Sequence, residues 1–269
     1  MDEQQRRLNE EGRQIWNTKA AFWDELHGDQ GNVFHQRLVN PAVERLLELQ
    51  SGERILDVAC GSGVMARHLA SMGAHVTAVD FSSELIERAK ARGQTDGTTI
   101  YYNVVDATDE QALVELGKGT FDAIICTMAL MDMPVIAPLF RAVRQLLTDE
   151  GRFVFVTSHP AFHSNNPTFA VELKDQDGQL VTERHLKTTA YLKIAPVKGT
   201  GAPNEPAPHY YYHMPLHELL SHGFRAGLVL DAIEEPAFDE SDSVAERPLS
   251  LLNFWQFPPV LAARMRIGR

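Results

Sequence analysis

Two glycines and two acidic residues at a fixed spacing could bind a ligand that carries a ribose. The stretch "ILDVACGSGVMA", residues 55–66, places Asp57 inside an apolar run, with Gly61 and Gly63 directly after it. Asp80 ends the next apolar run, "HVTAVD", 19 residues after Gly61. A carboxylate at that distance from a glycine turn can accept hydrogen bonds from both hydroxyls of a ribose.

A ligand with an adenosine moiety leaves two reactions open. One is hydride transfer from a nicotinamide dinucleotide, and the other is methyl transfer from S-adenosylmethionine. Asp57 favours methyl transfer, because a carboxylate four residues before Gly61 repels a pyrophosphate and attracts a cationic or zwitterionic ligand. The glycine turn also contains no basic residue that could meet a phosphate.

The glycine turn must connect a buried strand to a helix. The run 55–59 is largely apolar, and Met65, Leu69 and Met72 have helical spacing. Strand and helix then alternate along the chain, which is typical of a doubly wound α/β fold with a mostly parallel sheet and helices on both faces. We expect strands at 54–59, 75–79, 99–105, 121–127 and 152–158, and helices near 63–72, 83–92, 109–116 and 136–148.

Local signals set the ends of these helices. Thr108 and Gln111 have the spacing of a capping box for the helix at 109–116. Gly93 and Gly151 follow predicted helices, at positions where a left-handed residue is favoured. A helix near 215–222, a strand near 226–235 and a last, antiparallel strand near 259–267 are expected to complete the sheet.

The pattern predicts four segments. Residues 1–50 form an N-terminal helical cap, and residues 51–158 form the cofactor-binding half of the main domain. Residues 159–209 contain six prolines and a hairpin signal at Asp177-Gly178, and are expected to be a lid insertion after the fifth strand. Residues 210–269 form the remainder of the same domain.

Composition limits the class of protein. The chain has 269 residues and a formal net charge of −11, which argues against binding to nucleic acid or to an anionic membrane. The polar N-terminus has no apolar core, so we expect no signal peptide, and no run reaches the length needed to span a bilayer. Cys60 and Cys126 have no metal-ligand spacing, so we expect no metal site, and reduced thiols in a cytoplasmic protein.

Five sequence blocks resemble the class I S-adenosylmethionine-dependent methyltransferases, and more closely the type 11 group that acts on small molecules. The blocks are "LDVACGSG", "VTAVDFS", "VVDATD", "FDAIICTMALMDMP" and "LLTDEGRFVFVTSHP", which cover residues 54–160 in order. The resemblance implies a Rossmann-like fold, S-adenosyl-L-methionine as cofactor and a small-molecule acceptor.

The resemblance assigns cofactor contacts residue by residue. The methionine end falls to Asp57, Ala59, Gly61 and Gly63, the ribose hydroxyls to Asp80, and the adenine to Phe81, Asp106 and Ala107. Thr127 and Met128 would lie near the transferred methyl group. Structural alternatives remain for three of them, since Asp106 could cap a helix, Phe81 could belong to the core and Met128 could serve packing.

Candidate acceptor and catalytic residues lie outside these blocks. Trp16, Phe34, Arg37 and Tyr211 are candidates for binding the acceptor, and ordinary aromatic packing is an equally good explanation for Trp16. If the acceptor must lose a proton, His213 is the first candidate base and His159 the second. In related enzymes a "YHRP" element borders the acceptor, and Met214 replaces its arginine here.

Two rival functions stay open at this point. A nicotinamide-dependent oxidoreductase would need affinity for a dinucleotide, which Asp57 opposes. A non-catalytic protein that binds S-adenosylmethionine would explain the absence of an obvious catalytic motif. The identity of the acceptor, the atom that is methylated and the oligomeric state do not follow from the sequence.

Overall fold

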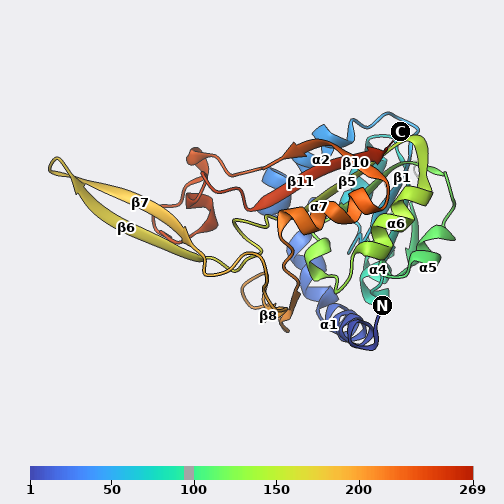
Figure 1. Cartoon of the computed structure of the whole chain (residues 1–269), viewed down its shortest axis with the longest axis horizontal. Helices are drawn as coiled ribbons and strands as arrows, with labels where there is room; N and C mark the ends of the chain where they lie inside the picture. The colour runs from blue at the N-terminus through green and yellow to red at the C-terminus, as the bar shows by residue number, and fades with distance from the viewer. Residues whose placement is uncertain (94–99, 269) are drawn as a thin grey trace.

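A mixed sheet forms the centre of the molecule, which is a computed structural model that describes residues 1–93 and 100–268 (Figure 1). Seven strands within these residues follow the order β10-β11-β5-β4-β1-β2-β3. All of them run in parallel except β11, which is antiparallel to both β5 and β10. Their bounds are β1 Arg54–Val58, β2 His75–Asp80, β3 Tyr101–Val104, β4 Phe121–Thr127, β5 Leu147–Ser158, β10 Leu228–Glu234 and β11 Val260–Ile267.

Helices cover both faces of this sheet. On one face α5 (Glu110–Val114), α6 (Ala137–Leu146) and α7 (Leu216–Arg225) bury an apolar cluster that contains Phe140, Phe153 and Phe155. On the other face the π-helix η1 (His35–Val39), α2 (Asn40–Leu47) and α3 (Val64–Ser71) bury a second cluster. The predicted α/β fold with an antiparallel last strand is therefore confirmed.

The N-terminal segment is a 25-residue helix, α1 (Glu3–His27), that packs against α4 (Ser83–Ala91). Asp2 begins α1 with a capping box, in which its side chain accepts from the backbone of Gln5. Near the other end of the helix, Oδ1 of Asp24 lies 2.5 Å from Nε of Arg92 in an ion pair. These contacts hold α1 across the carboxyl ends of the parallel strands.

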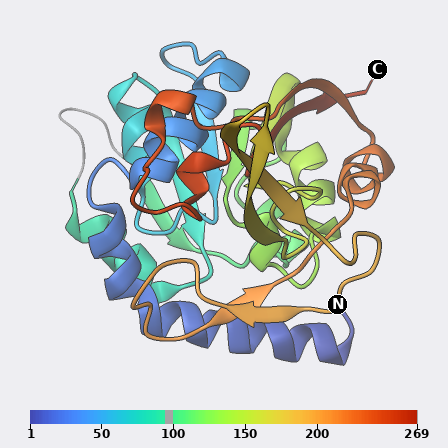
Figure 2. The ribbon, with the colours of Figure 1, turned by 90° about the vertical axis from the view of Figure 1, so that its left-hand side faces the viewer.

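The insertion after β5 has two parts. Strands β6 (Thr168–Gln176) and β7 (Gln179–Lys187) form the hairpin expected at Asp177-Gly178, and this hairpin projects away from the body of the molecule (Figure 1). Strands β8 (Val197–Gly199) and β9 (His209–Tyr211) form a short ribbon that lies beside α1 (Figure 2).

Three local predictions differ from the structure or fall outside it. Thr108 does not cap α5, because Asp109 takes that position and accepts from the backbone of Gln111 and Ala112. Gly151 is not a left-handed residue after a helix but lies within β5, where an added Cβ would come 2.9 Å from the carbonyl oxygen of Thr148. The predicted strand at 99–105 begins at residue 99, which lies outside the described residues.

Among residues 1–93 and 100–268, no helix is both long enough and apolar enough to cross a lipid bilayer. The same residues contain no group of three or more His, Cys, Asp or Glu side chains arranged to hold a metal ion.

Candidate active site

A cavity of about 410 Å³ lies at the carboxyl ends of the central parallel strands, between the sheet and α1. Its wall on the sheet side comes from residues 59–62 after β1, 80–81 at the end of β2, 105–108 after β3, and 127–129 and 131–133 at the end of β4. Asn9, Trp16 and Trp23 of α1 form the opposite wall. Ligands of doubly wound folds bind at this edge of the sheet, so we treat the cavity as the candidate site.

The turn after β1 has a backbone that few residues other than glycine adopt. Ala59, Gly61 and Gly63 all have positive φ, at 58°, 55° and 79°. A Cβ on Gly63 would lie 2.6 Å from the hydroxyl oxygen of Tyr102, whereas a Cβ on Gly61 would meet no atom within 4 Å. Gly63 is therefore required for packing, while Gly61 leaves open space in which a ligand can approach the backbone.

Asp80 connects this turn to the end of β2. Its Oδ2 accepts from the backbone N–H of Gly61 at 2.9 Å, and its Oδ1 accepts from that of Ser82 at 2.9 Å. Each oxygen keeps a further lone pair, and the side chain lines the cavity. Burial raises the pKa of this carboxyl to about 6.

Asp57 is fully buried behind the turn and does not line the cavity itself. Neither of its carboxylate oxygens has a hydrogen-bond partner of good geometry among the described residues. Burial and the neighbouring charge of Asp80 raise its pKa to about 8. An acid in this state would be stabilised by a cation brought close to it.

Asp106 lies after β3 and contacts α1. Its Oδ2 accepts from Nδ2 of Asn9 at 2.5 Å, and its Oδ1 accepts from the backbone and the hydroxyl of Thr108 at 2.8 and 2.7 Å. The carboxylate lines the cavity and also holds the loop after β3. Asp106, which the resemblance assigns to the adenine, thus also links α1 to the sheet through Asn9.

The structure brings most of the other predicted binding residues to the cavity. Phe81, Ala107, Thr127 and Met128 line it on the sheet side, and Met128 has the strained φ of 53°. From the remaining segments, Trp16, Phe34 and Tyr211 also line it. Arg37 does not, since its side chain is 63% exposed and lies 3.5 Å from Asp242.

Neither predicted catalytic histidine lines the cavity. Nε2 of His159 lies 2.8 Å from Glu235, and its Nδ1 accepts from the backbone of Ala161. Nδ1 of His213 lies 2.9 Å from the hydroxyl of Ser164, and its Nε2 lies 2.5 Å from the carbonyl oxygen of Tyr191. Both imidazoles are occupied in holding loops together.

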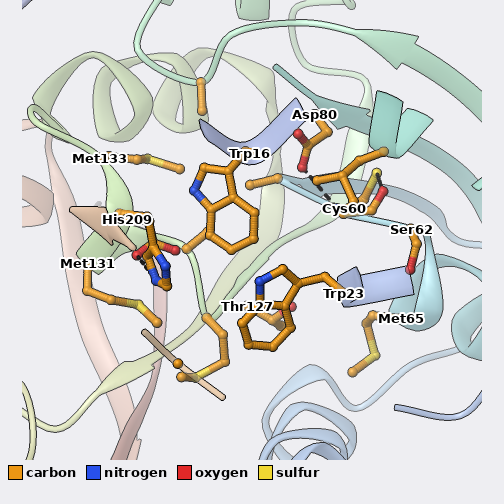
Figure 3. A pocket seen from close by; sticks show the side chains of 18 of the residues that line it. Trp16, Trp23, Cys60, Ser62, Met65, Asp80, Thr127, Met131, Met133 and His209 are labelled. Atoms are coloured by element: carbon orange, nitrogen blue, oxygen red, sulfur yellow. Dashed lines mark hydrogen bonds and ion pairs between the residues drawn. The ribbon is translucent and has the colours of Figure 1, made fainter. Parts of the chain in front are cut away.

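Sequence reasoning missed several residues that do line the cavity. Figure 3 shows Trp16 in its middle, with Asp80 on one side and His209 on the other. His209 begins the run "HYYYH", and Asp132 follows β4 inside the block "FDAIICTMALMDMP". Both sequence segments carry candidate residues, but which of their residues face the cavity depends on where β9 begins and where β4 ends. Further lining residues are Asn9, Cys60, Met131 and Met133.

Comparisons with known proteins place this site in a family. A family model described as a methyltransferase domain matches residues 55–151. The chain is similar to the crystal structure of an S-adenosylmethionine-dependent methyltransferase from Mesorhizobium loti, with a TM-score of 0.63 and 27% identity, over 84% of this chain and 96% of that one. The chain contains a class I S-adenosylmethionine-dependent methyltransferase domain. The predicted family and its cofactor, S-adenosylmethionine, are thereby confirmed.

Other relatives of this methyltransferase agree at a coarser level. A ubiquinone biosynthesis O-methyltransferase from Xylella fastidiosa strain 9a5c is 39% identical over 146 residues, which are 52% of this chain and 56% of that protein. The chain spans about half the length of the curated relatives it matches. A putative methyltransferase from Listeria monocytogenes, at 18% identity and a TM-score of 0.63, shares the fold.

The residues of the methyltransferase cavity fit the chemistry of S-adenosylmethionine. The ligand carries a sulfonium and an ammonium group, and Asp57 is a buried acid without a hydrogen-bond partner of good geometry in the described chain. The ligand also carries a ribose, and Asp80 keeps free lone pairs toward the cavity. A purely structural role would leave the burial of Asp57 unexplained, because an unpaired buried carboxyl is destabilising.

Proposed function

We propose that the chain transfers the methyl group of S-adenosylmethionine to a small-molecule acceptor inside this cavity. The observation that carries the proposal is the pair formed by Asp57 and Asp80 around the left-handed turn at Gly61. Asp57 would attract the cationic methionine end, and Asp80 would accept from the ribose hydroxyls. Phe81, Asp106 and Ala107 would surround the adenine, and Thr127 and Met128 would lie below the reacting methyl group.

When bound, S-adenosylmethionine supplies a methyl group that is already activated by a positive sulfur. The protein then needs mainly to align the acceptor and to exclude water, which can contribute several kcal/mol to lowering the barrier. Trp16, Trp23 and Tyr211 would perform both tasks, since they close the cavity with large apolar surfaces.

Several features support a small-molecule acceptor. The cavity holds about 410 Å³, in the range of pockets for small ligands. The net charge of −11 does not favour nucleic acid. The name of the Xylella relative refers to transfer to oxygen, which supports an acceptor with a hydroxyl group. Both cysteines are free, which supports a reducing cytoplasmic location.

The direct test is transfer of a labelled methyl group from S-adenosylmethionine to a panel of small phenols, amines and thiols. The account predicts label in at least one acceptor and loss of that signal in Asp57→Asn. Binding of S-adenosylmethionine without any transfer would favour the alternative, a non-catalytic cofactor-binding protein.

A further inference from the structure

A cluster of ionisable side chains lies at the end of the cavity away from Asp80. Nζ of Lys19 lies 2.7 Å from Oε1 of Glu205, and both side chains are completely buried. Nδ1 of His209 lies 3.2 Å from the same Glu205 oxygen. On the other side of the ring, Nε2 of His209 lies 3.8 Å from Oδ1 of Asp132. The four residues come from α1, the loop before β9, β9 itself and η2 (Leu130–Asp132).

Two atoms of this cluster have no hydrogen-bond partner of good geometry among the described residues. They are Nδ1 of His209 and Oδ1 of Asp132, and both side chains line the cavity. Glu205 lies 3.2 Å from Nδ1 of His209, so Oδ1 of Asp132 is the atom left for a ligand. Leaving a buried polar atom unpaired costs roughly 1–3 kcal/mol. Buried polar groups that lack a partner next to a cavity indicate a polar ligand, because native structures seldom contain them without a reason.

We propose that His209 is a catalytic residue that accepts the proton of an acceptor hydroxyl group, and that Asp132 binds the same hydroxyl. This inference rests on the proposed methyl transfer. Since Nε2 and Oδ1 are 3.8 Å apart, one oxygen atom can lie within hydrogen-bond distance of both. Glu205 faces Nδ1 and favours the tautomer with the proton on Nδ1, which leaves the Nε2 lone pair free.

The step balances with the groups present. The acceptor oxygen forms a bond to the methyl carbon while the carbon–sulfur bond breaks, and the electron pair of that bond stays on sulfur. The hydroxyl proton moves to Nε2 of His209, and the resulting imidazolium later loses it to water. The products are a methyl ether, a neutral thioether and one proton, which equal the charge of the sulfonium and the neutral hydroxyl consumed.

The surroundings hold His209 in the form that the step needs. The ring lies between the ring of Trp16, at 5.0 Å between centroids, and that of Tyr211, at 4.4 Å. Burial, with a further effect from the charge of Lys19, lowers the pKa of His209 to about 4 despite the opposing charge of Glu205. Burial also raises the pKa of Asp132 well above its usual range. The imidazole is therefore neutral but a weak base, and Glu205, 3.2 Å from Nδ1, stabilises the imidazolium as the proton is transferred. The raised pKa favours the protonated form of Asp132, which can donate to the acceptor oxygen.

The same charges favour a hydroxyl over an ammonium acceptor. Lys19 is a cation of this cluster, and burial disfavours the ionised form of Asp132, so a second cation would be poorly stabilised here. Met131 and Met133 add an apolar wall beside Trp16 (Figure 3). A flat, uncharged molecule with a hydroxyl at one end fits this lining.

The first test compares His209→Gln with His217→Gln, whose side chain is exposed on α7. With S-adenosylmethionine and a series of simple phenols, we expect His209→Gln to lower kcat about 100-fold or more, the usual effect of removing a general base. Thiophenol, which ionises near neutral pH, should lose less than about fivefold. The cofactor affinity of both variants should stay at the wild-type value. The kcat of the control His217→Gln should also stay at the wild-type value. An equal loss for phenol and thiophenol, or no loss for phenol, would overturn the inference.

A second measurement does not depend on turnover. Histidine-labelled protein saturated with S-adenosylhomocysteine is titrated with phenol and followed by NMR. We expect the His209 resonance to move, and Asp132→Ala to weaken the phenol affinity. A His209 resonance whose chemical shift does not change when phenol is added contradicts the inference while leaving the methyl-transfer proposal intact. If the protein transfers no methyl group to any acceptor, it is the proposed function that fails.

Discussion

Nδ2 of Asn9 donates to Oδ2 of Asp106 at 2.5 Å, although 97 residues separate them in the chain. This bond fastens the N-terminal helix to the loop after β3, directly beside the cavity. Asn17 makes a second such contact, since its Oδ1 accepts from the hydroxyl of Ser82 at 2.6 Å. The helix therefore covers the site through polar contacts at its rim, and these can break without loss of the apolar core.

Replacing Asn9 should therefore speed the exchange of cofactor. A hydrogen bond to a charged group contributes about 1.5 kcal/mol or more, so Asn9→Ala should raise the dissociation rate of S-adenosylhomocysteine roughly tenfold. Stopped-flow fluorescence of Trp16 and Trp23 would measure it. Gln14→Ala is the matched control, because Gln14 hydrogen-bonds to Glu10 on the same helix. Equal rates for both variants would show that α1 does not gate the site.

Asp57 should make cofactor affinity depend on pH. Its pKa is about 8 in the cofactor-free protein, so the group is largely protonated at pH 7. A cationic ligand prefers the ionised form, and the affinity for S-adenosylmethionine should rise as pH rises from 6 toward 8, with release of a proton. Calorimetry in buffers of different ionisation enthalpy would count that proton, and Asp57→Asn should abolish its release.

The same residue should make the empty protein less stable at high pH. The folded pKa lies above the unfolded value near 4, so the stabilising contribution is complete below pH 4 and is lost as pH rises through 8. Asp57→Asn should thus raise the free energy of unfolding at pH 8 by roughly 1–3 kcal/mol, the scale of one buried unpaired group. Urea unfolding at pH 5 and pH 8 would check this, and a loss of stability at pH 8 would contradict it.

The buried ion pair between Lys19 and Glu205 should be costly to break on one side. Lys19→Met leaves Glu205 with two hydrogen bonds of good geometry, from Nε1 of Trp23 at 2.8 Å and from the backbone of Gly201 at 2.6 Å. We expect a loss of about 3 kcal/mol in unfolding free energy, the lower range for an unpaired buried charge. The double variant Lys19→Met/Glu205→Gln should recover at least half of that loss. No recovery would mean that packing of the Lys19 chain, and not its charge, is what matters.

Shortening the projecting hairpin should leave the site unchanged. Deleting residues 172–175 and 180–183 keeps the alternation of faces, the turn at Asp177-Gly178 and the contacts of Phe169 with Phe254 and of Arg184 with Trp255. The melting temperature and the cofactor dissociation constant should stay within error and within twofold of wild type. A tenfold weaker affinity would show that the hairpin tip reaches the cavity.

The sheet could be predicted from the sequence because the signals that determine its strands are local. The apolar run at 55–59, the glycines after it and the alternation that follows determine β1, the turn and α3 regardless of distant contacts. The hairpin at Asp177-Gly178 was equally local. The prediction for Gly151 was wrong, because its small size is needed for a close approach to Thr148 within β5. The sequence alone does not distinguish a glycine required for close packing from a glycine that ends a helix.

The acceptor side could not be predicted in the same way. His209, His213 and the tyrosines between them form one run, and the choice among them depends on the pairing of β9 with β8 and on its contact with α1. Lys19 and Glu205 are 186 residues apart and look like ordinary surface charges in the sequence. Only the folded chain shows that they are buried together beside the cavity.

Binding calorimetry tests the central claim most directly. The chain is titrated with S-adenosylmethionine, S-adenosylhomocysteine and NAD, beside the variant Asp80→Ala. The account predicts heat of binding for the first two ligands and none for NAD. It also predicts a loss of about 1.5–3 kcal/mol in affinity for Asp80→Ala, which no longer accepts from the ribose. Binding of NAD without binding of S-adenosylmethionine would contradict the account.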